Sequence, residues 1–167
     1  TYTATGLVKG TTYYCAVVAV DRANNFNPAV GPVSAVPADV VPPENVTGLS
    51  AAPYDDHLLF TWSPSANTGG DLAHYKAYLD GASEGITIAP DVTSYDVTGL
   101  SPASAHSLKV TAVDSDGNES TGAQITGYTL LDNPAITSTE PYSGYVDLAW
   151  NAVSPSAHLQ TYRVYVS

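Results

Sequence analysis

The chain has 167 residues and carries 5 Lys and Arg against 16 Asp and Glu, so its formal net charge at pH 7 is −11. Such an acidic chain repels a phosphate backbone and an anionic lipid surface, which argues against nucleic-acid binding and membrane insertion. Its 13 Gly and 12 Pro fall at short intervals, and this spacing excludes long helices and predicts an all-β protein.

A segment near the start of the chain, residues 5–21, returns at residues 98–114. Both copies begin with Thr-Gly-Leu and end with Ala-Val-Asp, and Asp21 corresponds to Asp114 at an offset of 93 residues. An offset of this size is close to the length of a small β-domain. It therefore predicts tandem domains rather than a stacked solenoid.

A second repeat connects the middle of the chain with its end, because Trp62 followed by Tyr75 returns as Trp150 followed by Tyr162. Only the middle of the chain holds both halves of the repeat in order. We therefore predict the C-terminal part of a domain at residues 1–38, a complete domain at 39–129 and the N-terminal part of a domain at 130–167.

In chain order, hydrophobic alternation bounded by turn residues predicts seven strands in the complete domain. They are expected at residues 46–52, 57–63, 72–79, 83–88, 94–98, 105–114 and 122–128. The first part should supply the last three of these strands and the third part the first three. Residues 36–43 contain three prolines, so we expect this linker to be extended and stiff.

The alternation also indicates which side chains face inward. Leu108, Val110 and Ala112 share one face of their strand, and Cys15 lies at the position of Leu108 in the first copy. We expect Cys15 to be a buried apolar filler rather than a reactive thiol. The expected structural core consists of Phe60, Trp62, Tyr75 and Leu100 in the complete domain, with Tyr13, Trp150 and Tyr162 in the partial ones.

These residues resemble the fibronectin type III family: a Trp in the second strand, a Tyr in the third, and a Gly-Leu corner that leads into a strand ending in Ala-Val-Asp. The resemblance implies an immunoglobulin-like β-sandwich of two antiparallel sheets, one complete domain flanked by two partial ones. In the first copy Tyr13 matches the family's corner tyrosine, whose phenol bonds back to the preceding turn. The complete copy has His106 at this position, and we expect a weaker corner there.

Oxygen-bearing side chains alternate in one loop, at Asp114, Asp116 and Asn118. This spacing is typical of the opening of a calcium loop, but the bidentate glutamate of such a loop is missing. A Gly-Asn pair between two strands is also explained by hairpin geometry. We expect a structural turn here, with calcium binding as the alternative, and no other cofactor.

Two sequons begin at Asn45 and Asn118, and both are candidate glycosylation sites in a secreting host. Three tyrosines, Tyr14, Tyr78 and Tyr165, are expected on outer sheet faces. There they would cover neighbouring side chains or dock a glycan or another domain.

The four histidines, His57, His74, His106 and His158, show no spacing typical of metal ligands, and no serine lies in a Gly-x-Ser-x-Gly elbow. We therefore expect no catalytic centre and no convergent set of Ser, His and Asp.

The sequence favours a non-enzymatic scaffold, extracellular or at the cell surface, that acts as a spacer or adhesive array through protein–protein contacts. One alternative is an accessory region of a secreted polysaccharide- or protein-degrading enzyme whose catalytic domain lies outside this segment. Another is homo-assembly, in which copies of the chain complete each other's partial domains head to tail.

Overall fold

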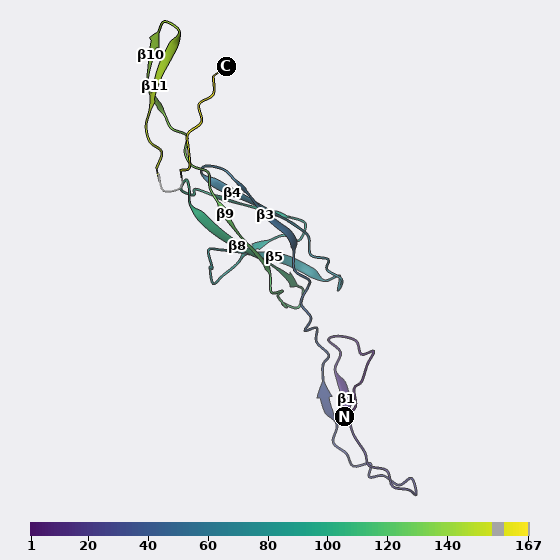
Figure 1. Ribbon diagram of the computed structural model, residues 1–167. Coiled ribbons are helices and arrows are strands. Elements are labelled where there is room, and N and C mark those ends of the chain that lie inside the picture. The colour runs from purple at the N-terminus through teal and green to yellow at the C-terminus, as the bar shows by residue number, and fades with distance from the viewer. Residues whose placement is uncertain (155–158, 167) are drawn as a thin grey trace. The chain divides into compact units, whose positions relative to one another are not determined.

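The computed structural model describes residues 1–154 and 159–166, and every regular element in them is a β-strand. The chain divides into two compact units, Thr1–Val41 and Pro42–Ser167, and each is described by itself. Figure 1 shows the complete domain at residues 42–129, built from the strands β3 to β9.

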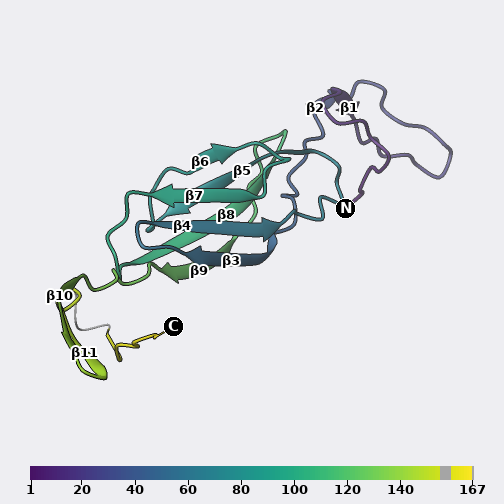
Figure 2. The same ribbon diagram turned by 90° about the horizontal axis from the view of Figure 1, so that it is seen from above.

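The first sheet of the complete domain has three antiparallel strands in the order β3-β4-β7. They are β3 (Thr47–Pro53), β4 (His57–Ser63) and β7 (Ser94–Thr98), which Figure 2 shows as one layer. The second sheet has four antiparallel strands in the order β6-β5-β8-β9. They are β5 (Leu72–Leu79), β6 (Ile86–Ile88), β8 (Ala105–Asp114) and β9 (Ala123–Tyr128).

The core lies between the two sheets because each strand presents alternate apolar side chains to the other layer. Trp62 is 5% exposed and meets Tyr75, which is fully buried, edge to face at a ring-centroid distance of 5.9 Å. Leu100 is half-buried against this cluster. The buried side chains around them are Val46, Leu58, Phe60, Ala77, Ile88, Val97, Leu108, Val110 and Ala112.

All seven strands predicted for the complete domain are present, and the all-β sandwich is confirmed. The largest difference is at β6, which begins at Ile86 rather than at residue 83. Asp80 and Gly81 have φ angles of 50° and 75°, and the N–H of Ala82 donates to the carbonyl of Leu79 at 2.9 Å. This turn delays the start of the strand.

The N-terminal unit contains two strands, β1 (Tyr13–Cys15) and β2 (Val33–Ala35), where three were expected. The prediction that Cys15 is buried is wrong, because its side chain is exposed, and Val17 two residues on is 89% exposed. Leu108 is buried at the equivalent position because a second sheet covers it. Among residues 1–41 the structure describes no sheet that faces β1 and β2, so side chains that were expected to point inward in this copy, such as Cys15, remain exposed.

Residues 130–166 contain the hairpin of β10 (Ile136–Tyr142) and β11 (Tyr145–Trp150). Trp150 and Tyr162 are half-buried and repeat the edge-to-face pair at 5.5 Å. The expected third strand, around Tyr162, is not formed in the described residues 159–166. In the complete domain the equivalent strand β5 is held by hydrogen bonds to β6 and β8, and the described part of this copy offers no such neighbours.

Candidate functional site at the corner of the complete domain

The first copy shows how the corner is built when a tyrosine occupies it. The phenol oxygen of Tyr13 accepts a hydrogen bond from the backbone N–H of Val8 at 2.9 Å. The N–H of Gly10 donates to the carbonyl of Pro37 at 3.0 Å, and Gly10 has a left-handed φ of 75°. The tyrosine therefore ties the strand to the turn that precedes it.

The complete domain repeats this corner 93 residues later with two substitutions. The N–H of Ala103, at the position of Gly10, donates to the carbonyl of Leu130 at 2.9 Å, so the backbone bond is kept. Ala103 keeps the left-handed conformation as well, with a φ of 53°, although its Cβ makes that conformation unfavourable. The second substitution places His106 where the first copy has Tyr13.

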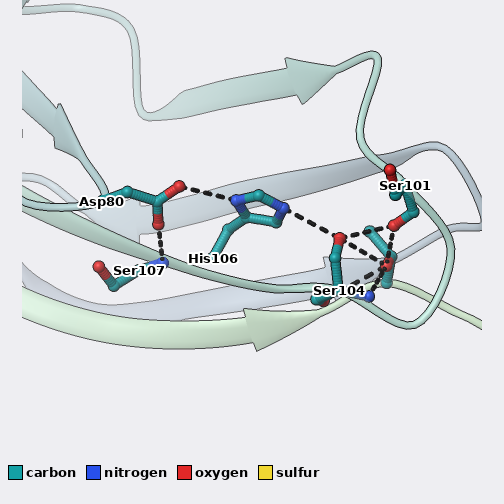
Figure 3. A network of polar contacts seen from close by, with 6 residues as sticks. Asp80, Ser101, Ser104, His106 and Ser107 are labelled. Atoms are coloured by element: carbon teal, nitrogen blue, oxygen red, sulfur yellow. Dashed lines mark hydrogen bonds and ion pairs between the residues drawn. The ribbon is translucent and has the colours of Figure 1, made fainter.

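His106 holds the corner through two polar contacts instead of one phenol bond (Figure 3). Its Nδ1 lies 2.7 Å from Oδ2 of Asp80, and its Nε2 lies 2.9 Å from Oγ of Ser104. The other carboxylate oxygen of Asp80 accepts the backbone N–H of Ser107 at 2.8 Å. The expectation that Ser, His and Asp side chains do not converge is therefore wrong, because Asp80 and Ser104 flank His106 in the fold.

This connectivity is that of a hydrolytic triad, but the surroundings of the serine suit a structural role. The Oγ of Ser104 lies 2.5 Å from the carbonyl of Ser101 and 3.2 Å from Oγ1 of Thr129, so it is already engaged by three polar groups. The N–H groups of Ala103, Ser104 and Thr129 are all donated within the corner, to Leu130, Thr129 and Ser104 respectively. None of these three is available to stabilise an oxyanion.

The electrostatics of Asp80 agree with a structural contact. Partial burial raises the pKa of Asp80, but the hydrogen bonds from His106 and from the N–H of Ser107 outweigh it, so the pKa lies below its usual value. The repeat could have revealed His106 as the substitute for Tyr13. Asp80 lies 26 residues away on another strand end, and no local sequence pattern signals that the two meet.

The loop predicted as a turn or a calcium site is closed by Asp114, which is 2% exposed. Its Oδ1 accepts the N–H groups of Asp116 and Asn118 at 2.9 and 2.8 Å, and its Oδ2 accepts the amide Nδ2 of Asn118 at 2.8 Å. Asp21 makes the same three contacts with Ala23 and Asn25 in the first copy.

Burial raises the pKa of Asp114, whereas these hydrogen bonds, led by those from Asn118, lower it by more, so the net shift is downward. Both carboxylate oxygens of Asp114 are used by its own loop. These hydrogen bonds give Asp114 a structural role in closing the turn.

Both predicted glycosylation sites have structural hydrogen bonds at the side-chain amide. The Nδ2 of Asn45 donates to Oγ1 of Thr121 at 2.9 Å, and its Oδ1 accepts the N–H of Gly122 at 2.7 Å. The Nδ2 of Asn118 is bonded to Asp114. A glycan attached to the Nδ2 of Asn45 or Asn118 would replace one of its two hydrogens, so the hydrogen bond made by that nitrogen would have to use the remaining one.

Of the other histidines, His57 stacks on Tyr54 at a ring-centroid distance of 3.9 Å, and its Nδ1 lies 2.7 Å from Oδ1 of Asp56. His74 pairs with Val113 across β5 and β8. His158 lies outside the described residues.

A polar cluster that the sequence did not predict surrounds Glu119. Its carboxylate accepts the ammonium of Lys76 at 2.9 Å, the hydroxyl of Tyr78 at 2.6 Å and the hydroxyl of Thr111 at 2.8 Å. Burial raises the pKa of Glu119, but these three donors lower it to about 2. Tyr78 is therefore half-buried and hydrogen-bonded rather than simply exposed.

The fold and the corner can be compared with known proteins. A family model described as "Fibronectin type III domain" matches residues 41–128, more than half of the chain. The chain belongs to the fibronectin type III family. The match includes His106, so within a fibronectin type III domain the Asp80–His106–Ser104 set occupies the position of the corner tyrosine.

Among curated relatives, Exoglucanase B of Cellulomonas fimi is 32% identical over 161 residues, which cover 92% of this chain and 14% of the relative. Tenascin-R of Gallus gallus is 29% identical, over 88% of this chain and 10% of the relative. This fibronectin type III chain thus spans about a seventh of the length of the exoglucanase. Among solved structures, "Crystal Structure of FN3tt" is 26% identical, covers 54% of this chain and 97% of its own, and has a TM-score of 0.44.

Within residues 1–154 and 159–166, no helix has the length and apolar character needed to span a bilayer.

Proposed function

We propose that this chain is a non-catalytic, extracellular spacer or adhesion scaffold made of fibronectin type III modules. One observation carries the proposal: the Ser–His–Asp set, the arrangement most suggestive of chemistry, stands where the first copy has the structural Tyr13. The side chains that could act chemically are used to hold turns and strands together. This role matches the domain plan of a complete module at 39–129 flanked by parts of modules at 1–38 and 130–167.

The partners under this proposal are neighbouring domains of the same array and other proteins outside the cell. Relatives such as Tenascin-R support it, because they contain similar segments as a small part of a much longer chain. The net charge of −11 favours solubility and disfavours contact with nucleic acid.

Ser104→Ala gives a direct test of the non-catalytic role. Wild-type chain and variant are incubated with nitrophenyl esters, nitrophenyl glycosides and a fluorogenic peptide. We expect the same background rate from both, because the N–H groups of Ala103, Ser104 and Thr129 are already donated within the corner and cannot stabilise an oxyanion. A rate above background that disappears in Ser104→Ala, with an unchanged melting temperature, would refute the proposal.

The spacing role depends on the linker at residues 36–43 and has its own test. Cys15 is exposed and can carry a spin label, and Ser83→Cys supplies a second exposed position in the complete domain. We expect a narrow distribution of label-to-label distances, which becomes broad when the three prolines of the linker are replaced by glycine. Equal widths in both proteins would show that the linker does not fix the spacing.

A second candidate function is an accessory segment of a polysaccharide-degrading enzyme. It is favoured by the 32% identity with Exoglucanase B, which covers nearly all of this chain and only 14% of that protein. The two functions are separated by assaying the parent polypeptide on glucans. The accessory role is favoured if the parent polypeptide hydrolyses soluble glucan and keeps this activity after the present segment is deleted. A parent polypeptide that does not hydrolyse glucans would exclude this role.

A further inference from the structure

The outer face of the four-stranded sheet differs in charge from the rest of the molecule. Within the described strands β5, β6, β8 and β9, no acidic residue occupies an outward position, although the chain as a whole has a net charge of −11. Both basic residues of the complete domain, Lys76 and Lys109, lie there. The middle of this face carries Lys76, Tyr78, Lys109, Thr111, Gln124 and Thr126.

The charge of Lys76 is neutralised within the fold. Glu119 reaches over this face from the connection between β8 and β9 and pairs with Lys76 at 2.9 Å. The same carboxylate accepts the hydroxyl of Tyr78 at 2.6 Å, which fixes the position of the ring. The ring also lies against Gly85, where an added Cβ would come within 2.8 Å of Cζ. Tyr78 is therefore held by a hydrogen bond at its hydroxyl and by the backbone beside its ring.

Lys109 has no such partner. Its ammonium lies 5.7 Å from the centroid of the Tyr78 ring, and among the described residues it forms no ion pair. Lys109 pairs with Tyr78 of β5 on one side and with Gln124 of β9 on the other, so the three side chains form a row across the sheet. They line a shallow hollow of about 340 Å³ together with Gly81 and Ala82 of the turn after β5.

The lining indicates which class of ligand fits. An ammonium without a carboxylate partner favours an anionic group, and a carboxylate gives a charge-assisted hydrogen bond. The amide of Gln124 both donates and accepts, as sugar hydroxyls require. The hollow offers no large aliphatic anchor of the kind that dominates peptide interfaces. The net charge of −11 opposes a long polyanion, because the repulsion grows with the number of charges on the ligand, and it therefore favours a short ligand with few carboxylates.

We propose that this hollow binds a sugar of the uronic-acid class, with its carboxylate on the ammonium of Lys109 and a ring hydroxyl on the amide of Gln124. The aromatic ring of Tyr78 forms one wall of the site. Since one charged contact and one amide carry the affinity, the binding is weak, with a Kd on the order of 1 mM. The inference does not depend on the scaffold role, because the site uses none of the corner residues.

The test is a titration of ¹⁵N-labelled chain with a trimer of galacturonate, followed by amide chemical shifts. We expect saturable shifts around Lys109 and Gln124 and none from the neutral galactose trimer. Lys109→Gln should weaken binding at least tenfold, and Lys109→Arg should restore it. Lys9→Gln, which removes the same charge from the N-terminal unit, is the matched control and should bind like the wild type.

Three results would overturn the proposal: no shifts at 10 mM galacturonate trimer, equal shifts from the neutral trimer, or tighter binding of an acidic peptide such as tetraglutamate at the same residues. The melting temperature of each variant is measured alongside. If Lys109→Gln does not fold, Gln124→Ala is used instead. We expect this variant to lose several-fold in affinity for the sugar, and an unchanged affinity would contradict the proposal.

Discussion

The core predicts a specific difference between two substitutions of Trp62. Its indole is 5% exposed and packs edge to face on Tyr75. Trp62→Ala removes this side chain and leaves a cavity, so we expect a loss of about 3–5 kcal/mol in the free energy of unfolding. For a domain whose whole stability is about 5–15 kcal/mol, this is a large share.

Trp62→Phe should cost much less, for a reason visible in the structure. The indole Nε1 of Trp62 is buried and has no hydrogen-bond partner among the described residues. An unsatisfied buried donor costs about 1–3 kcal/mol, and phenylalanine removes that donor while it keeps an aromatic ring against Tyr75. Removal of the unsatisfied donor stabilises the variant, whereas the smaller ring fills the core less well and destabilises it. We expect these two effects to offset each other partly, which leaves a net loss of about 1–2 kcal/mol in the free energy of unfolding.

Urea unfolding followed by far-UV circular dichroism measures both variants, because this signal comes mainly from the backbone amides and not from tryptophan fluorescence. Trp150→Ala is the matched control, since Trp150 makes the same pair with Tyr162 but is only half-buried. It should leave the main transition in place. The reasoning is refuted if Trp62→Ala unfolds like the wild type, or if Trp62→Phe is as destabilised as Trp62→Ala.

Four further predictions concern the corner, the Glu119 cluster and the thiol. His106→Tyr should stay within about 1 kcal/mol of the wild type in urea unfolding, whereas His106→Ala should lose about 1–3 kcal/mol by leaving its polar partners unsatisfied; equal losses would exclude the corner role. Ala103→Gly relieves a φ of 53° and should raise stability by about 1 kcal/mol, and a lower melting temperature would contradict this. The pKa of Glu119 is lowered to about 2, so the ionised carboxylate stabilises the folded state by no more than about 3 kcal/mol. This stabilisation is fully present above pH 4.5 and is lost as the pH falls towards 2. Acid titration of Glu119→Gln should therefore show a shallower fall in stability than the wild type, and parallel curves would argue against the cluster. Cys15 should react with a thiol reagent in the native chain within a few-fold of the rate for free cysteine, and strong protection would mean that it is buried after all.

One part of the corner site can be predicted from the sequence repeat, and the other part cannot. Comparison of the two copies places His106 on Tyr13 and Ala103 on Gly10, so the altered corner is visible in the sequence. The contact with Asp80 is not visible, because the pairing of β5 with β8 brings Asp80 to His106 from 26 residues away. Ser104 lies only two residues before His106, but no sequence pattern signals that its hydroxyl turns to the imidazole. For the same reason the expected absence of a converging Ser, His and Asp set was wrong.

The sequence by itself determined the sandwich, its seven strands and the repeat, because alternation with a period of two and turn residues are local properties of the chain. Only the tertiary structure decided what each polar group does. Burial depends on whether a second sheet lies opposite, which separates Cys15 from Leu108, although the two occupy the same position in the repeat. The fold also decides which charges are paired: Glu119 neutralises Lys76, whereas Lys109, half-buried beside the Tyr78 ring, has no ion pair among the described residues.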